Sequence, residues 1–383
     1  MSSSKGRTAA GVLSEWLRLR MPLDRLSYEH LKQKDVPRHP MSWAYFLGGL
    51  TLCALAVQVA TGPLLMLYYQ PSTAFAHESV RFIESVVPGG SLVRNMHAWS
   101  ANAMIVFLFM HASTVGATRA YRNPRELTWL TGVVLLVCTL AMAFSGYLLP
   151  WSTLSVYATR VGTEILQVST DFMPYPLSEA GALAATLLAG SQGVGQATLT
   201  RFYALHVVFL PLLILAAVGA HLLLIQLHGM SMPLRLRDKG LEQAAERFFP
   251  GFFLKECGVW LIFLGSLAIL SVLLPYDCLL PYTLAGAFDP LAPAPAGIKP
   301  EWYFYFLYYP LEMLPRAAAI SATFAFFVAL AAAPWLLRWL PSLWGASFEN
   351  SKFPTVAAIA VSVFVLLLTL FGSELVRLVR GLP

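Results

Sequence analysis

The chain has 383 residues, of which 57% are hydrophobic and only 12% carry a charge. This composition excludes an ordinary soluble domain, in which about a quarter of the residues are charged. The formal net charge of +6 does not indicate nucleic-acid binding, because the basic residues lie in short segments between apolar stretches, where they set orientation in a membrane. The sequence therefore predicts an all-α integral membrane protein.

The first 41 residues are polar and basic and contain no apolar stretch of the signal-peptide type. Within them, residues 8–34 alternate apolar and charged positions with a helical period around Pro22. Their apolar runs are too short to cross hydrocarbon, so we predict an amphipathic segment at the membrane surface. The four cysteines are scattered and form no C-x-x-C or C-x-x-C-H motif, which argues against a disulfide framework and against a standard covalent c-type haem.

Seven apolar stretches are long enough to cross a bilayer as helices. They lie at about 43–68, 96–117, 128–149, 203–226, 257–274, 317–339 and 354–376. Basic residues gather before the first span, after the second and after the fourth, and these ends should share the cytoplasmic side. The N-terminus is then cytoplasmic, although Arg377 and Arg380, at the outer end of the seventh span, run against the rule.

Two long connections, 150–200 and 275–316, fall on the outer side by this count. Both are rich in Pro, Gly and aromatic residues, and both exceed the length of a plain connection. Long ordered loops that cover a bundle usually carry function.

Four histidines lie inside apolar helices, where polar side chains are costly and indicate function. His97 and His111 are fourteen residues apart on the second predicted span, and His206 and His221 are fifteen apart on the fourth. Each pair returns to nearly one helical face about 21–22 Å along the axis. One such histidine is more often a satisfied interior residue. Two matched pairs favour two haems stacked between facing helices of a four-helix bundle.

Glycines repeat the same interval on the neighbouring spans. Gly48 and Gly62 on the first, and Gly132 and Gly146 on the third, are each fourteen residues apart. Glycine is frequent in membrane helices for packing alone. The matching interval instead favours clearance, because a glycine lets a bulky ring approach the backbone where a Cβ would collide.

Several motifs together resemble cytochrome b of the quinol–cytochrome c reductases, and especially cytochrome b6 joined with its companion subunit IV in one chain. The resemblance covers about residues 36–376 and rests on QVATG, PRELTW, GYLLPW, TLTRFYALH and KPEWYF together with the histidines and glycines. It implies a four-helix diheme domain at 42–230 and a three-helix domain with the PEWY loop at 231–383, and the amphipathic segment at 1–41 precedes them on the cytoplasmic side.

The resemblance implies two non-covalent b-type haems. The outer one would lie between His97 and His206, and the inner one between His111 and His221. Arg94 matches a family arginine beside a haem propionate, a carboxylate that needs a cationic partner when buried. Arg201 would act likewise, unless it is an interfacial arginine that reaches for water.

The family oxidises quinol at its outer surface. Carried over, Glu301 would accept a proton from bound quinol, since a carboxylate in an apolar pocket can have a raised pKa suited to that task; otherwise Glu301 is a solvated interfacial acid. Further positions that match the family's quinol pocket, where interfacial aromatics are a competing interpretation, are Tyr147, Tyr157, Thr159, Pro300 and Tyr308.

The family reduces quinone on the inner side, where His228 and Glu256 are the available protonatable groups, and Lys255 and His30 are weaker candidates. Three departures stand out. Phe46 replaces the cysteine that attaches an extra haem in the b6 branch, so no covalent haem is predicted. Thr114 replaces an arginine that Arg119 could supply instead, and Glu312 replaces another arginine. Gln226 also replaces a usual basic or His residue at the inner site.

The leading hypothesis is the diheme membrane subunit of a quinol–cytochrome c, or related carrier, oxidoreductase that builds a proton gradient. It would oxidise quinol outside and reduce quinone inside, with a Rieske iron–sulfur protein, a c-type cytochrome and lipids as partners, as a homodimer in a bacterial inner membrane. An alternative is a diheme anchor of a quinone-linked dehydrogenase that does not split electrons. A third is a haem-free transporter that uses histidines for proton coupling.

Overall fold

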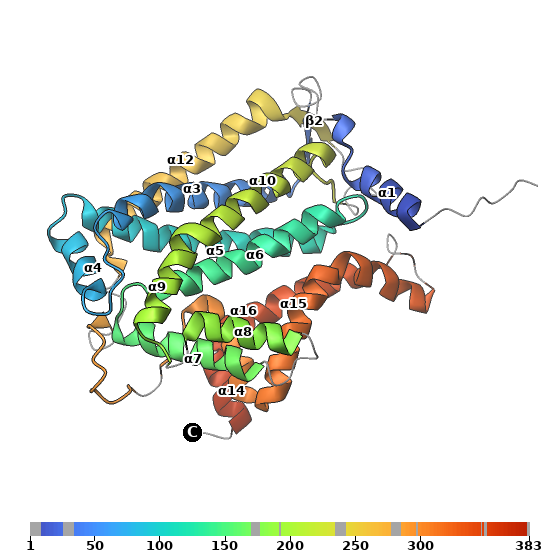
Figure 1. Cartoon of the computed structure of the whole chain (residues 1–383). Helices are drawn as coiled ribbons and strands as arrows, with labels where there is room; N and C mark the ends of the chain where they lie inside the picture. Colours follow the sequence, from blue (N-terminus) through green and yellow to red (C-terminus); the bar gives the residue numbers. More distant parts are fainter. Residues whose placement is uncertain are drawn as a thin grey trace, which may run out of the picture.

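The computed structural model describes residues 9–25, 34–169, 177–190, 193–233, 243–276, 285–295, 298–345, 347 and 351–380. Within these ranges it is mainly helical (Figure 1). Seven helices are long and apolar enough to cross a membrane, which confirms the predicted number. They span Ser42–Met66, Gly90–Thr118, Glu126–Tyr147, Gln196–His228, Phe248–Leu273, Arg316–Leu343 and Phe353–Arg380.

Four of these helices form the bundle that carries the histidines and glycines. Helix α3 (Phe46–Met66) packs along α5 (Gly90–Thr118), and α6 (Glu126–Tyr147) packs along α10 (Leu210–His228). Each glycine-bearing helix therefore lies beside a histidine-bearing one, and α5 also contacts α6. The pairing brings the two histidine intervals to one interior.

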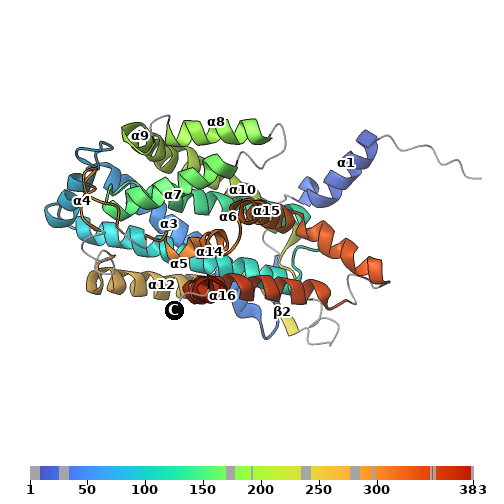
Figure 2. The same cartoon turned by 90° about the horizontal axis from the view of Figure 1, so that it is seen from below.

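The remaining membrane helices cover this bundle. Helix α12 (Phe253–Leu273) contacts α3 and α5, α16 (Phe353–Arg380) contacts α5, and α15 (Arg316–Trp339) contacts α6 (Figure 2). The short helix α14 (Tyr305–Met313) packs against α16 and α15. Its aromatic residues join α5, α6 and α16 in one apolar cluster, formed by Ile105, Leu108, Leu136, Leu140, Tyr303, Phe306, Tyr309 and Leu368.

The N-terminal region closes one end of the bundle. Helix α1 (Ala9–Arg20) lies within the amphipathic segment predicted at 8–34, and β1 (Asp35–Arg38) pairs antiparallel with β2 (Gln243–Arg247). Arg20, the last residue of α1, forms a 2.6 Å ion pair with Glu126 at the start of α6, and both side chains are buried. This contact fixes α1 against the bundle at the end to the right in Figure 1.

The two long connections contain helices and lie against each other. The first holds α7 (Thr153–Ser169) and α8 (Leu177–Ala189), and α9 (Gln196–Ala204) follows it into the fourth span. The second reaches a 3-10 turn at Trp302–Phe304. The Thr153 N–H donates to the Gly286 carbonyl at 2.9 Å, and the Phe288 N–H donates to the Trp151 carbonyl at 3.2 Å. At the same end, α4 (Ala76–Ser85) packs on α5.

The basic residues that conflict with the orientation rule have acidic neighbours. Arg377 pairs with Glu374 at 3.3 Å, and Arg380 pairs with Glu312 at 3.2 Å. Both arginines at the end of α16 therefore have a carboxylate partner. The orientation rule counts Lys and Arg and gives little weight to acidic residues, so the conflict at this end remains.

Changing Glu126 to Gln should destabilise the protein by about 3 kcal/mol, because it leaves the buried guanidinium of Arg20 without a charged partner. The measurement is the midpoint of thermal unfolding of the purified protein in detergent, which should fall by about 5 °C. The matched control is Glu374→Gln, which breaks a pair with side chains 60% and 63% exposed and should cost less than about 1 kcal/mol. Equal midpoints for the two variants would contradict the anchoring role of Arg20 and Glu126.

Candidate functional site

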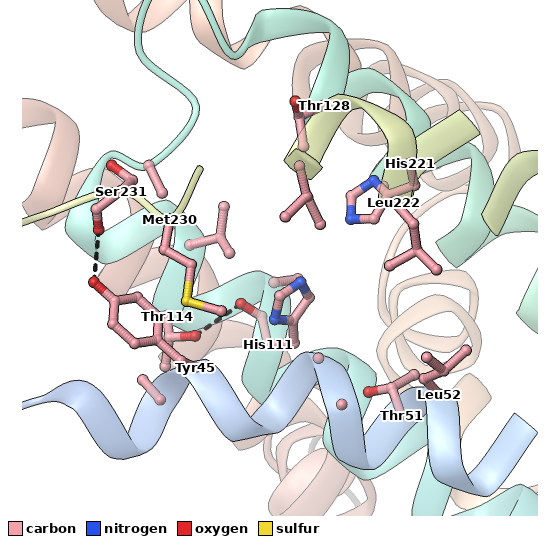
Figure 3. Close-up of a pocket in the computed structure, with 18 of the residues that line it drawn as sticks. Tyr45, Thr51, Leu52, His111, Thr114, Thr128, His221, Leu222, Met230 and Ser231 are labelled. Carbon is pink, nitrogen blue, oxygen red and sulfur yellow. Dashed lines mark hydrogen bonds between the residues drawn. The ribbon is translucent and has the colours of Figure 1, made fainter. Parts of the chain in front are cut away.

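The four predicted histidines face one another in two pairs. The rings of His97 and His206 have centroids 6.3 Å apart with planes inclined by 70°. An iron atom bound by both rings needs about 6 Å between ring centres, because each metal–nitrogen bond measures about 2 Å and each nitrogen lies about 1 Å from its ring centre. His111 and His221 line a common cavity and reach into it from opposite walls (Figure 3). Both pairs fit a group held between two imidazoles.

Hydrogen bonds fix the proton of three of these imidazoles on Nδ1. The hydroxyl of Thr61 donates to the Val57 carbonyl at 2.6 Å, so it can only accept from His97 Nδ1–H, which lies at 2.8 Å. Thr131 similarly donates to a carbonyl of its own helix and faces His221 Nδ1 at 2.9 Å.

His206 Nδ1 lies 3.0 Å from the Met142 carbonyl, which can only accept. With Nδ1 protonated, Nε2 of His97, His221 and His206 carries the lone pair that a metal requires. The Nδ1 atom of His111 is buried and has no hydrogen-bond partner among the described residues.

A π turn explains the fifteen-residue step between His206 and His221. The turn covers Leu205–Phe209, and the Leu210 N–H bonds to the Leu205 carbonyl five residues back. Pro211 follows and has no N–H for the i−4 carbonyl, which favours such an irregularity. The turn takes up one extra residue, so fifteen residues here match the fourteen between the histidines of α5.

Each of the four glycines lies against one histidine ring. A Cβ placed at Gly48 would lie 3.2 Å from His111 Cε1, at Gly62 3.6 Å from His97 Cε1, and at Gly132 3.4 Å from His221 Cε1. At Gly146 it would lie only 2.4 Å from His206 Cε1. Each of these glycines therefore leaves room for a histidine ring beside its backbone.

The inner histidine pair opens into a cavity of about 470 Å³ that continues to the end of the bundle near α1. This volume lies in the usual range for ligand and cofactor sites. Besides the two histidines, the cavity is lined by polar groups from five segments of the chain: Lys34, Tyr45, Arg125, Gln226, His228 and Glu256. The two residues predicted for the inner site, His228 and Glu256, are therefore brought together on its wall.

Lys34 also lines this cavity, and the sequence did not single it out. Its Nζ donates to Gln226 Oε1 at 2.9 Å. Burial lowers the pKa of Lys34 to about 8, although the nearby carboxylate of Glu256 acts to raise it. A lysine with such a pKa can exchange a proton near neutral pH. Nothing in the sequence distinguished it from the other basic residues that precede the first span.

The other inner candidates have defined neighbours. Glu256 packs against Gly49, where a Cβ would lie 1.7 Å from its Oε1, and His228 Nε2–H donates to the Arg20 carbonyl at 3.0 Å. Lys255 is half exposed and bonds both carboxylate oxygens of Glu246. His30 lies outside the described residues.

The two arginines predicted near haem carboxylates have protein partners. Arg94 forms an ion pair with Glu84 of α4, and both side chains are mostly buried. Arg201 is exposed and its Nη1 lies 3.4 Å from the Thr186 carbonyl in the last turn of α8. A cation at a helix C-terminus is favoured by the helix dipole, so Arg201 has a structural role in this arrangement.

Glu301 lies among phenols at the opposite end of the bundle. Its Oε1 accepts a hydrogen bond from the Tyr276 hydroxyl at 3.3 Å. Burial raises the pKa of Glu301, and the hydrogen bond from Tyr276 opposes that rise. Burial, together with Glu301, Tyr276 and Tyr147, also raises the pKa of Tyr303. The Tyr147 hydroxyl is buried without a hydrogen-bond partner among the described residues, so it can serve a ligand.

The other predicted outer residues lie on α7, just before the 3-10 turn, and on α14. On α7, Tyr157 packs edge to face with Phe288 at 5.7 Å, and the buried Thr159 hydroxyl donates to the Ser155 carbonyl at 2.7 Å. Pro300 directly precedes Glu301, which caps the 3-10 turn. Tyr308 lies further along on α14, and its hydroxyl donates to Glu312 at 3.0 Å. Tyr308 is thus engaged with Glu312.

Three departures from the resembled pattern have defined contacts in the structure. Arg119 does not replace the missing arginine at Thr114 by facing the cavity, because its Nε donates to Thr355 at 2.9 Å and its Nη2 to the Ser351 carbonyl at 2.6 Å. Glu312 carries its reversed charge opposite Arg380. Phe46 stacks on Phe252, with ring centroids 4.9 Å apart.

Comparisons with known proteins agree with this architecture. A family profile described as cytochrome b/b6/petB matches residues 31–229, and one described as cytochrome b(C-terminal)/b6/petD matches 288–379. The chain is 38% identical over 368 residues to the cytochrome bc complex cytochrome b subunit of Chlorobaculum thiosulfatiphilum, covering 96% of this chain and 81% of the relative. It is 40% identical over 220 residues to cytochrome b6 of Oltmannsiellopsis viridis, covering 57% of this chain and 98% of the relative.

A solved structure titled "Hyperthermophilic respiratory Complex III" aligns with 96% of this chain and 99% of its own, with a TM-score of 0.70 and 26% identity. The chain therefore belongs to the cytochrome b family, whose members bind b-type haem. Within that family it is a cytochrome b of the bc/b6f-type complexes, a subunit of a quinol oxidoreductase.

Changing Gly146 to Ala should reduce the b-type haem bound per chain, because the new methyl group would meet His206 Cε1 at 2.4 Å and overpacking displaces the ring. The measurement is the reduced-minus-oxidised difference spectrum of the purified protein. Gly219→Ala on the same helix as His221 is the matched control, since its Cβ would meet no atom within 4 Å. Equal haem content in the two variants would contradict the role given to Gly146.

Proposed function

We propose that the chain holds two non-covalent b-type haems, one between His97 and His206 and one between His111 and His221. The observation that carries this proposal is the pairing of the histidines, with each ring against a glycine and three rings protonated on Nδ1. When bound, two haems supply one-electron carriers at two depths of the membrane. Phe46 at the position of the haem-attaching cysteine supports the absence of a covalent haem.

At the outer side, Glu301 is proposed to accept a proton from bound quinol. Quinol must lose two protons and two electrons to become quinone, and a carboxylate whose pKa is raised by burial lies nearer to working pH than an exposed one. Tyr147, with its buried hydroxyl, would orient the substrate. Tyr157, Thr159, Pro300 and Tyr308 are proposed to shape the surrounding pocket. One electron would go to a Rieske iron–sulfur protein and the other toward the inner side.

At the inner side, Glu256 and Lys34 are proposed to supply the protons that quinone takes up on reduction. Both line the cavity that begins at His111 and His221. The Lys34 ammonium would also attract the negative charge that develops on quinone oxygen as electrons arrive. Gln226 holds Lys34 by its hydrogen bond, and His228 completes the polar wall of the same cavity.

The assembly and the orientation complete the proposal. Arg20, Lys34 and Arg125 meet at one end of the bundle, which supports a cytoplasmic N-terminus in a bacterial inner membrane. Oxidation outside and reduction inside would then release and take up protons on opposite faces. Domain boundaries at 42–230 and 231–383 are proposed with a segment at 1–41 before them. Partners would be a Rieske protein, a c-type cytochrome or equivalent carrier, lipids and a second copy of the chain, and not nucleic acid.

His97→Ala should remove the outer haem and His111→Ala the inner one, because each ring supplies one of two opposed ligands. The number of haems per chain is measured from the pyridine haemochrome spectrum. Redox titration then shows which haem remains in each variant. His77→Ala is the control, since His77 lies on α4, outside the four-helix bundle, with its Nδ1 3.3 Å from the Pro150 carbonyl. Two haems retained in either ligand variant would overturn the assignment.

Glu301→Gln should slow quinol oxidation by about tenfold to a hundredfold while both haems remain bound, because an amide cannot accept the proton. In the unaltered complex the rate should rise with pH through the pKa of Glu301, since only the ionised carboxylate is an acceptor. The measurement is steady-state quinol oxidation by the whole complex in membranes between about pH 5 and pH 9. Unchanged turnover in the variant would remove Glu301 from its role.

A further inference from the structure

One face of α5 carries three polar side chains that hold the chain after α12. Asn95, Trp99 and Asn102 follow the spacing i, i+4, i+7, so they share one side of the helix. Trp99 Nε1–H donates to the Leu274 carbonyl at 2.9 Å, and the Tyr276 N–H donates to Asn95 Oδ1 at 3.1 Å. The end of α12 is therefore fixed on α5 through specific hydrogen bonds.

These contacts place the Tyr276 side chain between α5 and the segment that carries Glu301. The Tyr276 ring packs edge to face on Trp99, with centroids 5.4 Å apart. Asn102 Nδ2–H lies 3.4 Å from the Tyr276 hydroxyl, and Asn102 Oδ1 accepts from Trp302 Nε1–H at 2.7 Å. Asn102 thus ties Tyr276 to the residue that follows Glu301.

We propose that Tyr276 is a positioning residue for Glu301, which holds the carboxylate in one orientation and favours its ionised form. This inference rests on the proposed role of Glu301 as proton acceptor. The geometry that carries it is the chain of contacts from Asn102 through the Tyr276 hydroxyl to Glu301 Oε1. A donor that itself accepts a hydrogen bond is polarised and becomes a stronger donor.

The hydrogen bond from Tyr276 is important because the groups that the structure describes around Glu301 do not carry a positive charge. Among the described residues, the titratable groups that face Glu301 are phenols: Tyr147 on α6, Tyr276 after α12, Tyr303 in the 3-10 turn and Tyr305 on α14. Neutral phenols do not attract a carboxylate as a cation does. In this setting burial raises the pKa of Glu301, and the donor that acts against it is the hydroxyl of Tyr276. Removing that hydroxyl should make the carboxylate harder to ionise.

The test is the pH profile of quinol oxidation by the complete complex that carries Tyr276→Phe. The ring and the backbone N–H remain, so the contacts with Trp99 and Asn95 can persist. The rising limb of the profile should move to higher pH by about one unit, which corresponds to about a tenfold slower rate on the acid side. At alkaline pH the rate should recover toward that of the unaltered complex, because Glu301 is then ionised without help.

Tyr305→Phe is the matched control. Tyr305 is also a neighbour of Glu301, but the hydrogen bond to that carboxylate comes from Tyr276, so the pH profile of Tyr305→Phe should stay in place. Asn102→Leu provides a second variant: it removes the contact that polarises the Tyr276 hydroxyl and should shift the limb in the same direction by a smaller amount. The haem spectrum of each variant shows whether the bundle is intact.

The outcomes separate this inference from the function on which it rests. If Glu301→Gln leaves turnover unchanged, the proposed role of Glu301 is wrong. If Glu301→Gln slows turnover but Tyr276→Phe leaves the limb in place, or lowers the rate equally at every pH, the positioning role is overturned and the proton-acceptor role stands. A limb shift in Tyr276→Phe with none in Tyr305→Phe supports the proposal.

Discussion

The close approach of four imidazoles to four glycines is the constraint on which the rest of the bundle depends. Helix α3 meets α5, and α6 meets α10, at positions where one partner has no side chain and the other has a ring. Polar rings in hydrocarbon are costly, and here hydroxyls or carbonyls of the same glycine-bearing helices satisfy the Nδ1 atoms of His97, His206 and His221. The glycine contacts thus set the spacing of the helices, and the hydrogen bonds set the orientation and tautomer of three of the four rings.

The sequence was sufficient for features that depend on local periodicity. The seven spans follow from uninterrupted apolar length, and the matched intervals indicated two facing pairs of histidines, whereas the pairing of His97 with His206 was implied by the resemblance to cytochrome b. It could not show that the glycines face imidazoles, because clearance for any bulky ring gives the same interval. The sequence also could not show how the fifteen-residue interval between His206 and His221 matches the fourteen-residue interval between His97 and His111. That match depends on the π turn at Leu205–Phe209, which is a feature of the local backbone.

Residues that act through distant partners were beyond the sequence. Lys34 meets Gln226 across 192 residues, and Asn102 meets Tyr276 across 174. In the sequence, Lys34 is one of several lysines and arginines near the membrane surface, and Tyr276 is a tyrosine at the end of a span. Neither local context indicates a role. Glu312 is a similar case. Its negative charge, where the resembled family has an arginine, is explained by the ion pair that it forms with Arg380. The acidic residues could be identified from the sequence, whereas the residues that contact them could be identified only from the fold.

The two ends of the bundle differ in the groups around their acidic residues: neutral phenols surround Glu301, and a lysine lies near Glu256. Glu301 lies among phenols, so its ionised form is supported by hydrogen bonding and opposed by burial. Glu256 lies near the Lys34 ammonium, whose own pKa burial lowers to about 8. An acid among neutral donors suits the acceptance of protons from a neutral substrate. A carboxylate with an ammonium that gives up its proton easily suits proton delivery to a substrate that becomes negative. The two histidine pairs are nearly symmetric. The difference in the surroundings of the two acidic residues therefore determines which end of the proposed electron path suits oxidation and which suits reduction.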